Sequence, residues 1–306
     1  MSSFVEVVEE ALLTYWSSPI SLAVLAVCGA CMGTLLYVFV TNARNAKLRV
    51  SLLTGLYALS IFFWAFVAGS LVLCVSQARM VAYAKNGVPL AVFGAVIGGL
   101  AASAAISGIV WKYENASVLR KFSPRLPTAA ESWLRDYVGI LAKFEGTGDI
   151  AIRITDTSAP LAMALGGKKR TILTSSGLLQ LLDRDETETV VAHELMHLKH
   201  HDAEFKVFSR GLSRILFFDP FSKFFDPAVH REREYLADEM GGRSTGKPAA
   251  LASALLKIAD RGVPPKSAWG LSIYGVGRGI FSRYPPLDES VQRLLLLSEI
   301  LPKPSE

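Results

Sequence analysis

The sequence predicts an α+β protein in which N-terminal transmembrane helices precede a separate domain of helices with a small sheet. Charge is the first observation: residues 1–111 contain five Lys/Arg and three Glu, whereas the other 195 residues contain 27 Lys/Arg and 24 Asp/Glu. The second is a set of three long uncharged stretches within residues 1–111. The third is that all five histidines lie within residues 193–230. These patterns exclude a disordered chain and a single soluble domain.

The first part of the chain is predicted to be a membrane anchor, residues 1–111, with three transmembrane helices. Residues 20–40, 50–76 and 88–111 contain no charged side chain and are 21, 27 and 24 residues long. At about 1.5 Å per residue, each can cross a hydrocarbon core of about 30 Å as a helix. A helix also satisfies its backbone hydrogen bonds in lipid. The lipid bilayer is therefore the first expected partner.

Lysine and arginine between these stretches predict the orientation of a multi-pass protein. None precedes the first stretch, whereas three follow it, two follow the second and four lie in residues 112–125. The positive-inside rule then places the N-terminus outside and residues 112–306 in the cytoplasm. The second part has a net charge of only +3 and no run of Lys/Arg, so we expect no nucleic-acid partner.

Residues 112–306 show the patterns of a folded domain. Strands are expected at residues 151–154, 161–164 and 170–173, and helices at 131–144, 186–201, 205–216, 228–240, 248–261 and 287–300. Ser175 or Ser176 can cap a short helix after the third strand. Asp185 with Glu188 three residues later predicts the start of the helix at 186–201.

The motif His193-Glu194-Leu195-Met196-His197 lies on this last helix. Two imidazoles four residues apart share a helix face, so both can bind one metal ion. Glu194 can reach the open coordination position and accept a proton from metal-bound water. The motif predicts a zinc metallopeptidase with one Zn²⁺ per chain. Asp202 is expected to close the helix.

Zinc needs a third protein ligand, and the extended motif that would supply a histidine has Ala203 at that position. Glu234 and Asp238 are four residues apart on a predicted helix and share a face. Either carboxylate can bind the ion while the other accepts a hydrogen bond from a ligand imidazole. Glu232 and Glu239 are expected to point elsewhere.

Three segments together resemble the integral-membrane zinc metallopeptidases of the HtpX heat-shock protease and CAAX prenyl protease family. They are residues 190–202, the pair Glu234 and Asp238, and the sequence Tyr-Pro-Pro-Leu-Asp-Glu that begins at Tyr284. The similarity extends over residues 158–296 and implies a zincin-like metallopeptidase domain. It further implies Glu194 as the general base, Asp238 as the acidic residue one turn after the third ligand, and, as zinc ligands, His193, His197 and Glu234.

The chain departs from the family pattern in three places. Residues 159–164 replace the usual Pro-Asn-Ala-Phe-Ala, Tyr284 replaces a histidine that helps to stabilise the transition state, and Ser290 replaces an arginine. A tyrosine hydroxyl can donate the same hydrogen bond to a developing oxyanion, so Tyr284 is a candidate catalytic residue. Packing beside Pro285, or donation by Arg283 instead, are the alternatives.

Two further segments bear on substrate and membrane. An extended peptide can add to an edge strand, and the candidate strand is Leu161, Ala162, Met163 and Ala164. The alternative is an internal strand with no substrate role. Residues 217–227 contain five Phe and two Asp-Pro pairs, and we expect this segment at the lipid interface beside the active site, or otherwise in the core.

The expected function is a membrane-anchored zinc endopeptidase acting at the cytoplasmic face. The resemblance implies peptide or protein substrates, membrane or membrane-associated, cleaved for quality control or specific processing. A signalling receptor and a non-catalytic scaffold are the alternatives. Only 19 residues precede the first stretch, which leaves no large external sensor, and an open coordination position argues against a scaffold. Intramembrane cleavage is disfavoured because the motif helix carries several charged residues.

Overall fold

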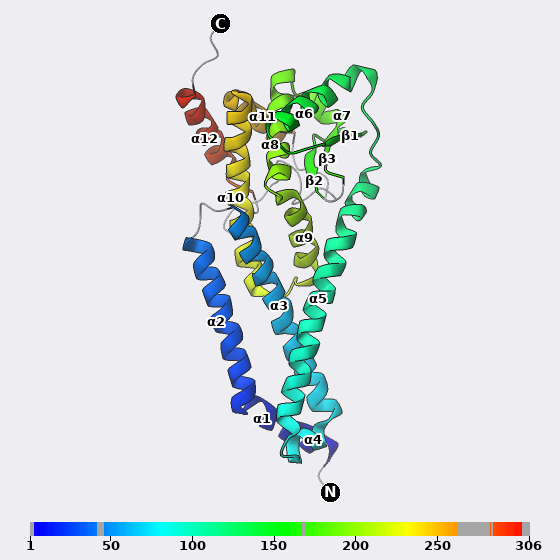
Figure 1. Cartoon of the computed structure of the whole chain (residues 1–306), viewed down its shortest axis with the longest axis vertical. Helices are drawn as coiled ribbons and strands as arrows, with labels where there is room; N and C mark the ends of the chain where they lie inside the picture. The colour runs from blue at the N-terminus through cyan, green and yellow to red at the C-terminus, as the bar shows by residue number, and fades with distance from the viewer. Residues whose placement is uncertain (1–2, 42–45, 167–168, 262–281, 283, 302–306) are drawn as a thin grey trace. The chain divides into compact units, whose positions relative to one another are not determined.

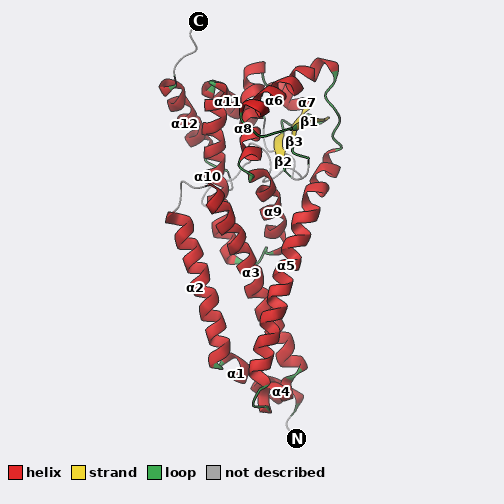
Figure 2. Ribbon diagram, viewed as in Figure 1, coloured by secondary structure: helices red, strands yellow, loops and turns green. Residues whose placement is uncertain are grey.

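The computed structural model describes residues 3–41, 46–166, 169–261, 282 and 284–301 (Figure 1). The chain divides into two compact units. The first unit comprises Met1–Val110 and Leu216–Ser222, and the second comprises Trp111–Ile215 and Lys223–Glu306. Figure 2 shows helices throughout, with strands confined to one small sheet. The predicted fold class, helices with a small sheet, is therefore confirmed.

The first unit is built from apolar helices. They are α1 (Phe4–Trp16), α2 (Pro19–Thr41), α3 (Ala46–Ser76), α4 (Ala78–Tyr83) and α5 (Gly87–Phe122), the last of which continues into the second unit. Three of them are long and apolar enough to cross a membrane, over Pro19–Phe39, Ser51–Ser76 and Gly87–Val110. The short α1 packs on α4 and α3, and the hydroxyl oxygens of Tyr15 and Ser70 lie 2.6 Å apart in its core.

A segment from far along the sequence, Leu216–Ser222, belongs to this first unit; it consists of a loop over residues 216–219 and the first three residues of the next helix. Asp219 is fully buried there, and its carboxylate accepts hydrogen bonds from Ser60 Oγ at 2.6 Å and Trp64 Nε1 at 3.3 Å. Both donors lie on the apolar stretch of α3. Phe217 and Phe218 are exposed, and the ring of Phe218 meets Trp64 edge to face. The loop thus combines apolar exposed side chains with one satisfied buried carboxylate.

The sheet of the second unit has the strand order β1-β3-β2. Strand β1 (Ala151–Thr155) runs parallel to β3 (Thr171–Ser175), and β2 (Ala162–Leu165) runs antiparallel to β3. Arg125 bridges the outer side of β1, whereas β2 forms the other edge of the described strands. All four residues of β2 are buried, because α8 packs against them.

Among the described residues, eight helices lie wholly or mostly in the second unit. They are the 3-10 helix η1 (Ala129–Glu131), α6 (Ser132–Phe144), α7 (Ser176–Leu181), α8 (Arg184–Lys199), α9 (Asp202–Ile215), α10 (Pro220–Thr245), α11 (Pro248–Asp260) and α12 (Leu287–Ile300). Of these, α6, α7, α8 and α9 contact the sheet. Pro227 lies inside α10, so the helix predicted at 228–240 is part of a longer one. Its ring removes one backbone hydrogen bond without ending the helix here.

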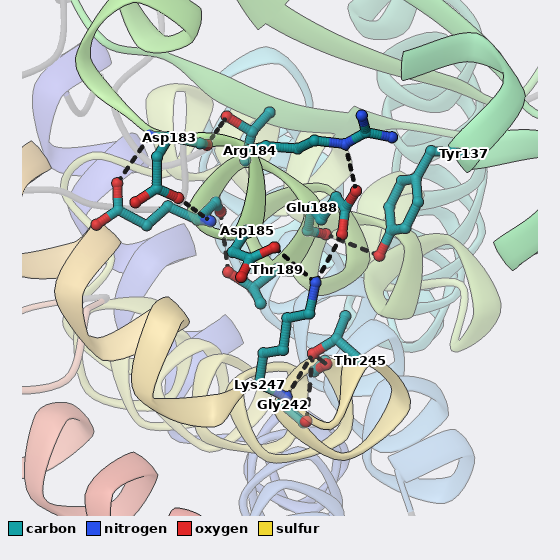
Figure 3. Close-up of polar contacts among 12 residues, drawn as sticks. Tyr137, Asp183, Arg184, Asp185, Glu188, Thr189, Gly242, Thr245 and Lys247 are labelled. Carbon is teal, nitrogen blue, oxygen red and sulfur yellow. Dashed lines mark hydrogen bonds and ion pairs between the residues drawn. The ribbon is translucent and has the colours of Figure 1, made fainter. Parts of the chain in front are cut away.

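The start of α8 differs from the prediction by two residues. Asp183 accepts a hydrogen bond from the Glu186 amide, and the Glu186 side chain accepts one from the Asp183 amide. The pair Asp185 and Glu188 has the same spacing, but its carboxylates bind Lys247 Nζ at 2.7 and 3.0 Å (Figure 3). The capping box is therefore formed by Asp183 and Glu186. Asp185 and Glu188 instead bind Lys247, which connects α8 to the turn before α11.

Burial makes α8 the central helix of the second unit. Its apolar side chains join two clusters, one shared with α6 and the sheet and one shared with α11 and α12. Glu186, although buried, pairs with Lys257 Nζ at 2.6 Å. The polar residues of the H-E-x-x-H motif lie in the C-terminal half of this buried helix, where water is excluded and every charge needs a partner.

Candidate metal centre

The two motif histidines face one another on α8. Both imidazoles are fully buried, and the Nε2 atoms of His193 and His197 lie 3.1 Å apart. This separation follows from helix geometry, since residues four apart stand on the same face. The face points toward α10, and Gly241 permits the approach: a Cβ there would lie 3.0 Å from both the Cα and the amide nitrogen of His193.

Helix α10 brings a carboxylate to the two imidazoles. Glu234 Oε2 lies 3.4 Å from His193 Nε2, and Glu234 Oε1 lies 3.7 Å from His197 Nε2. One ligand atom from each of the three residues falls within 4.8 Å of the other two. Two nitrogens and one oxygen at this spacing, all buried, match the donor set of a catalytic site for a divalent metal ion.

Each histidine has a carboxylate behind it. Asp238 Oδ1 lies 2.9 Å from His193 Nδ1, and Asp202 Oδ2 lies 3.5 Å from His197 Nδ1. A carboxylate on the distal nitrogen leaves the Nε2 lone pair directed at the ion. The sequence predicted the position of Asp238 one turn after Glu234. For Asp202, the sequence predicted only that it closes the end of α8. In the structure Asp202 is buried and pairs with Arg233 of α10.

The carboxylate of Glu194 is buried and is not engaged in a well-formed hydrogen bond within the part of the chain that the structure describes. It is fully buried, and neither oxygen meets a hydrogen-bond donor of good geometry among the described residues. Burial raises the pKa of Glu194, against the opposing charges of Lys206 and His193. The backbone N–H of Ala164 on β2 also opposes this rise, so the sheet edge lies beside the carboxylate.

Lys206 is a site residue that the sequence did not predict. It lies on α9, its side chain is 3% exposed, and its Nζ is 2.5 Å from Glu234 Oε1 and 3.0 Å from His197 Nε2. Burial alone would lower the pKa of Lys206, but the carboxylates of Glu234 and Glu194 raise it, so the side chain is an ammonium. The only hint in the sequence was that Lys206 lies four residues after Asp202 on the same helix. This spacing is common to ordinary surface pairs on helices, so it does not indicate a site residue.

The surroundings shift the pKa values of the two imidazoles in opposite directions. Burial would lower the pKa of His193, but the carboxylates of Asp238 and Glu234 reverse this and raise the pKa to about 10. Burial and the Lys206 ammonium lower the pKa of His197, which is therefore neutral. A neutral imidazole offers its lone pair directly, whereas His193 must release a proton before it binds an ion.

Tyr284 stands near this cluster. Its side chain is buried, and the phenol acts electrostatically on Lys206. Ser282 fixes the backbone at this point, since its Oγ donates to the Tyr284 carbonyl at 2.9 Å and accepts from the Tyr284 amide at 3.1 Å. Arg283, the alternative donor, lies outside the described residues. Ser290 is buried on α12.

The residues predicted to bind substrate lie on and before the edge strand. Leu161 precedes β2; its amide donates to Ser175 Oγ at 2.9 Å, and its carbonyl accepts from the Ser175 amide at 2.9 Å. Ala162, Met163 and Ala164 pair with β3 on one side only among the described strands. Glu232 and Glu239 of α10 are exposed and stand apart from the ligand cluster.

The fold and this centre define a metallopeptidase, and comparisons with known proteins agree. A family model described as BlaR1 peptidase M56 matches residues 70–259. A protein named Protease HtpX homolog from Pyrococcus abyssi is 30% identical over 235 residues, which cover 61% of this chain and 81% of the relative. Its namesake from Thermococcus kodakarensis is 30% identical over 240 residues, covering 62% and 82%.

A solved structure, the crystal structure of S. mikatae Ste24p, covers 90% of this chain and 99% of its own, with 15% identity and a TM-score of 0.33, too low to support a fold assignment. The sequence matches are sufficient by themselves. The chain belongs to the family of membrane metallopeptidases represented by the M56 model and these HtpX proteases. It is a membrane-anchored metalloprotease, and the protease reading is favoured over a receptor or scaffold.

Proposed function

We propose that the chain is a zinc endopeptidase that holds one Zn²⁺ with His193, His197 and Glu234. The observation that carries this proposal is the convergence of two buried imidazole nitrogens and a buried carboxylate within 4.8 Å. Zinc bound there would supply a water of lowered pKa and would polarise the scissile carbonyl. Asp238 and Asp202 would orient the two ligand imidazoles from behind.

Glu194 would act as the general base. Its place beside the first ligand supports this role, as does the absence of a donor of good geometry to its oxygens among the described residues. The carboxylate would take a proton from the attacking water and deliver it to the nitrogen of the leaving amine. Burial raises the pKa of Glu194, which makes it a better proton acceptor than an exposed carboxylate.

Substrate would bind as an extended strand along β2, with Leu161, Ala162, Met163 and Ala164 as its backbone partners. The nearness of the Ala164 amide to Glu194 supports this, because a peptide along that edge would lie beside the general base. Tyr284 would donate its hydroxyl hydrogen to the oxyanion of the tetrahedral intermediate. The supporting observations are that Tyr284 is buried and that its phenol contributes to the raised pKa of Lys206.

The substrates we propose are membrane or membrane-associated proteins, cleaved on the cytoplasmic side for quality control or specific processing. The three apolar spans and the lysines and arginines that follow them support a three-span anchor in residues 1–111 with the protease in residues 112–306. Labelling of single cysteines placed in residues 77–87 and near residue 303 with a membrane-impermeant maleimide would test the orientation in intact cells. Labelling near residue 303 would contradict the cytoplasmic assignment.

The decisive experiment compares the wild type with Glu194→Gln in detergent. We expect the wild type to digest casein, a chelator to abolish digestion, and Glu194→Gln to lose activity while it retains one zinc per chain. Glu239→Gln, an exposed carboxylate five residues after Glu234, is the matched control and keeps full activity. Full proteolysis by Glu194→Gln would remove the mechanism. The inactive variant also serves as a trap, because proteomics of membranes that contain it would identify bound substrates.

A further inference from the structure

The position of Lys206 within the ligand cluster goes beyond the proposed chemistry of the site. Its Nζ stands 3.0 Å from His197 Nε2 and 2.5 Å from Glu234 Oε1. Both residues are ligands of the proposed zinc site, and both are buried. The ammonium of Lys206 therefore contacts two of the three residues that would bind the ion.

The two contacts exclude simultaneous metal binding. A neutral imidazole has one lone pair in the ring plane at Nε2, and the hydrogen bond from Lys206 uses that lone pair. A metal ion bound to His197 would use the same lone pair. At Glu234, a divalent ion and an ammonium on one oxygen would repel each other strongly in a buried site. At His197 Nε2, Lys206 and the ion therefore exclude each other, whereas at Glu234 the second oxygen, Oε2, is left for the ion and the two positive charges repel across one carboxylate.

The surroundings of Lys206 offer the displaced ammonium a place to go. Glu194 and Tyr284 already act on it electrostatically, and both are buried. Asp202, one turn earlier on α9, pairs with Arg233 and does not need the lysine. After displacement from His197, the Lys206 ammonium would still have the Glu194 carboxylate as a nearby opposite charge, since this carboxylate already raises the pKa of Lys206.

We propose that Lys206 is an internal competitor for the metal: its ammonium holds His197 and Glu234 together in the metal-free protein, and metal loading exchanges that ammonium for the ion. This inference rests on the proposed ligand set. It implies that the centre binds zinc more weakly than its three ligands alone would, and that the metal-free site stays folded. A buried Glu234 without either cation would be an uncompensated charge.

The test is a zinc titration of the full chain in detergent against a chromophoric chelator. Lys206→Met removes the ammonium and keeps the side-chain length. We expect its zinc dissociation constant to fall at least about tenfold, because no buried ion pair is broken on loading. Lys257→Met, which removes a lysine paired with Glu186, is the matched control and keeps the wild-type constant. A Lys206→Met constant equal to or weaker than that of the wild type would overturn the inference.

A second measurement covers the folding of the variant. The thermal midpoint of metal-free Lys206→Met should lie below that of the metal-free wild type, and the two should converge when zinc is bound. A variant that folds only with zinc present supports the proposal, and Lys206→Gln is then titrated in its place with the same expected tightening. A wild type that binds no zinc would overturn the ligand set and this inference together. Equal zinc constants for the wild type and the neutral variants would overturn the inference alone.

Discussion

The packing of α10 on α8 gives a prediction whose size comes directly from the structure. Gly241 lies seven residues after Glu234, so both stand on the face of α10 that meets the motif histidines. A Cβ at Gly241 would lie 3.0 Å from two backbone atoms of His193 and 3.4 Å from its Cβ. Backbone atoms of a buried helix cannot turn aside. Gly241→Ala must therefore push the two helices apart.

The required displacement is about 0.5 Å, which restores ordinary carbon contacts of about 3.5 Å. Metal–ligand distances tolerate changes of only about 0.2 Å, so Glu234 would leave its proper position. Alanine gains about 1 kcal/mol of helix propensity over glycine, while overpacking of a tight interface costs about 1–3 kcal/mol. Gly139→Ala on α6 is the control, because no atom lies within 4 Å of its Cβ position. It should be stabilised by about 1 kcal/mol.

The assay is thermal unfolding of the zinc-loaded protein in detergent, together with the zinc dissociation constant. We expect Gly241→Ala to melt several degrees below Gly139→Ala and to bind zinc at least about tenfold more weakly than the wild type. Gly139→Ala should bind zinc as the wild type does. If Gly241→Ala gained as much stability as Gly139→Ala and kept its zinc affinity, the close approach of α10 to His193 would be refuted.

Three further predictions concern single side chains. Asp238→Ala removes the carboxylate behind His193 and should weaken zinc binding about 10–100-fold, whereas Glu239→Ala, its exposed neighbour, should not. Tyr284→Phe should lower kcat about 10²–10³-fold with an unchanged zinc constant, and an unchanged kcat would assign the residue to packing. The hydrogen bonds from Arg125 lower the pKa of Glu131 to about 2 from an ordinary 4.5. Its stabilising effect is therefore complete above about pH 4.5 and is lost as the pH falls toward 2. The difference in melting temperature between wild type and Glu131→Gln should shrink between pH 6 and pH 3, and a constant difference would contradict the assignment.

Sequence patterns predicted the features that depend on local chain geometry. The absence of charge predicted the three spans, and the spacing of His193 and His197 needed only a helix to bring their nitrogens together. The face shared by Glu234 and Asp238 likewise follows from one helix. The start of α8 was misplaced because Asp183 with Glu186 and Asp185 with Glu188 have the same spacing. Only the position of Lys247 in the fold decides between them.

Contacts between distant helices lay beyond the sequence. Asp202 and Lys206 reach the metal centre because the start of α9 lies beside His197 and because Arg233 and Glu234 of α10 meet them there, and no pattern within α9 encodes these contacts. The Asp219 hydrogen bonds join residues more than 150 positions apart, 155 in the case of Trp64. A search for buried charge could not find them either, since a lone Asp-Pro pair resembles any exposed turn.

The loop at the start of the segment Leu216–Ser222 affects any attempt to produce the protease without its membrane anchor. A fragment that starts at residue 112 would keep Asp219 and lose both Ser60 and Trp64, which donate to it in the intact chain. The exposed side chains of Phe217 and Phe218 would then form an apolar patch in contact with water, and such a patch promotes aggregation. Deleting the three spans is thus insufficient for a soluble enzyme: the loop needs polar replacements at both phenylalanines and an uncharged residue in place of Asp219.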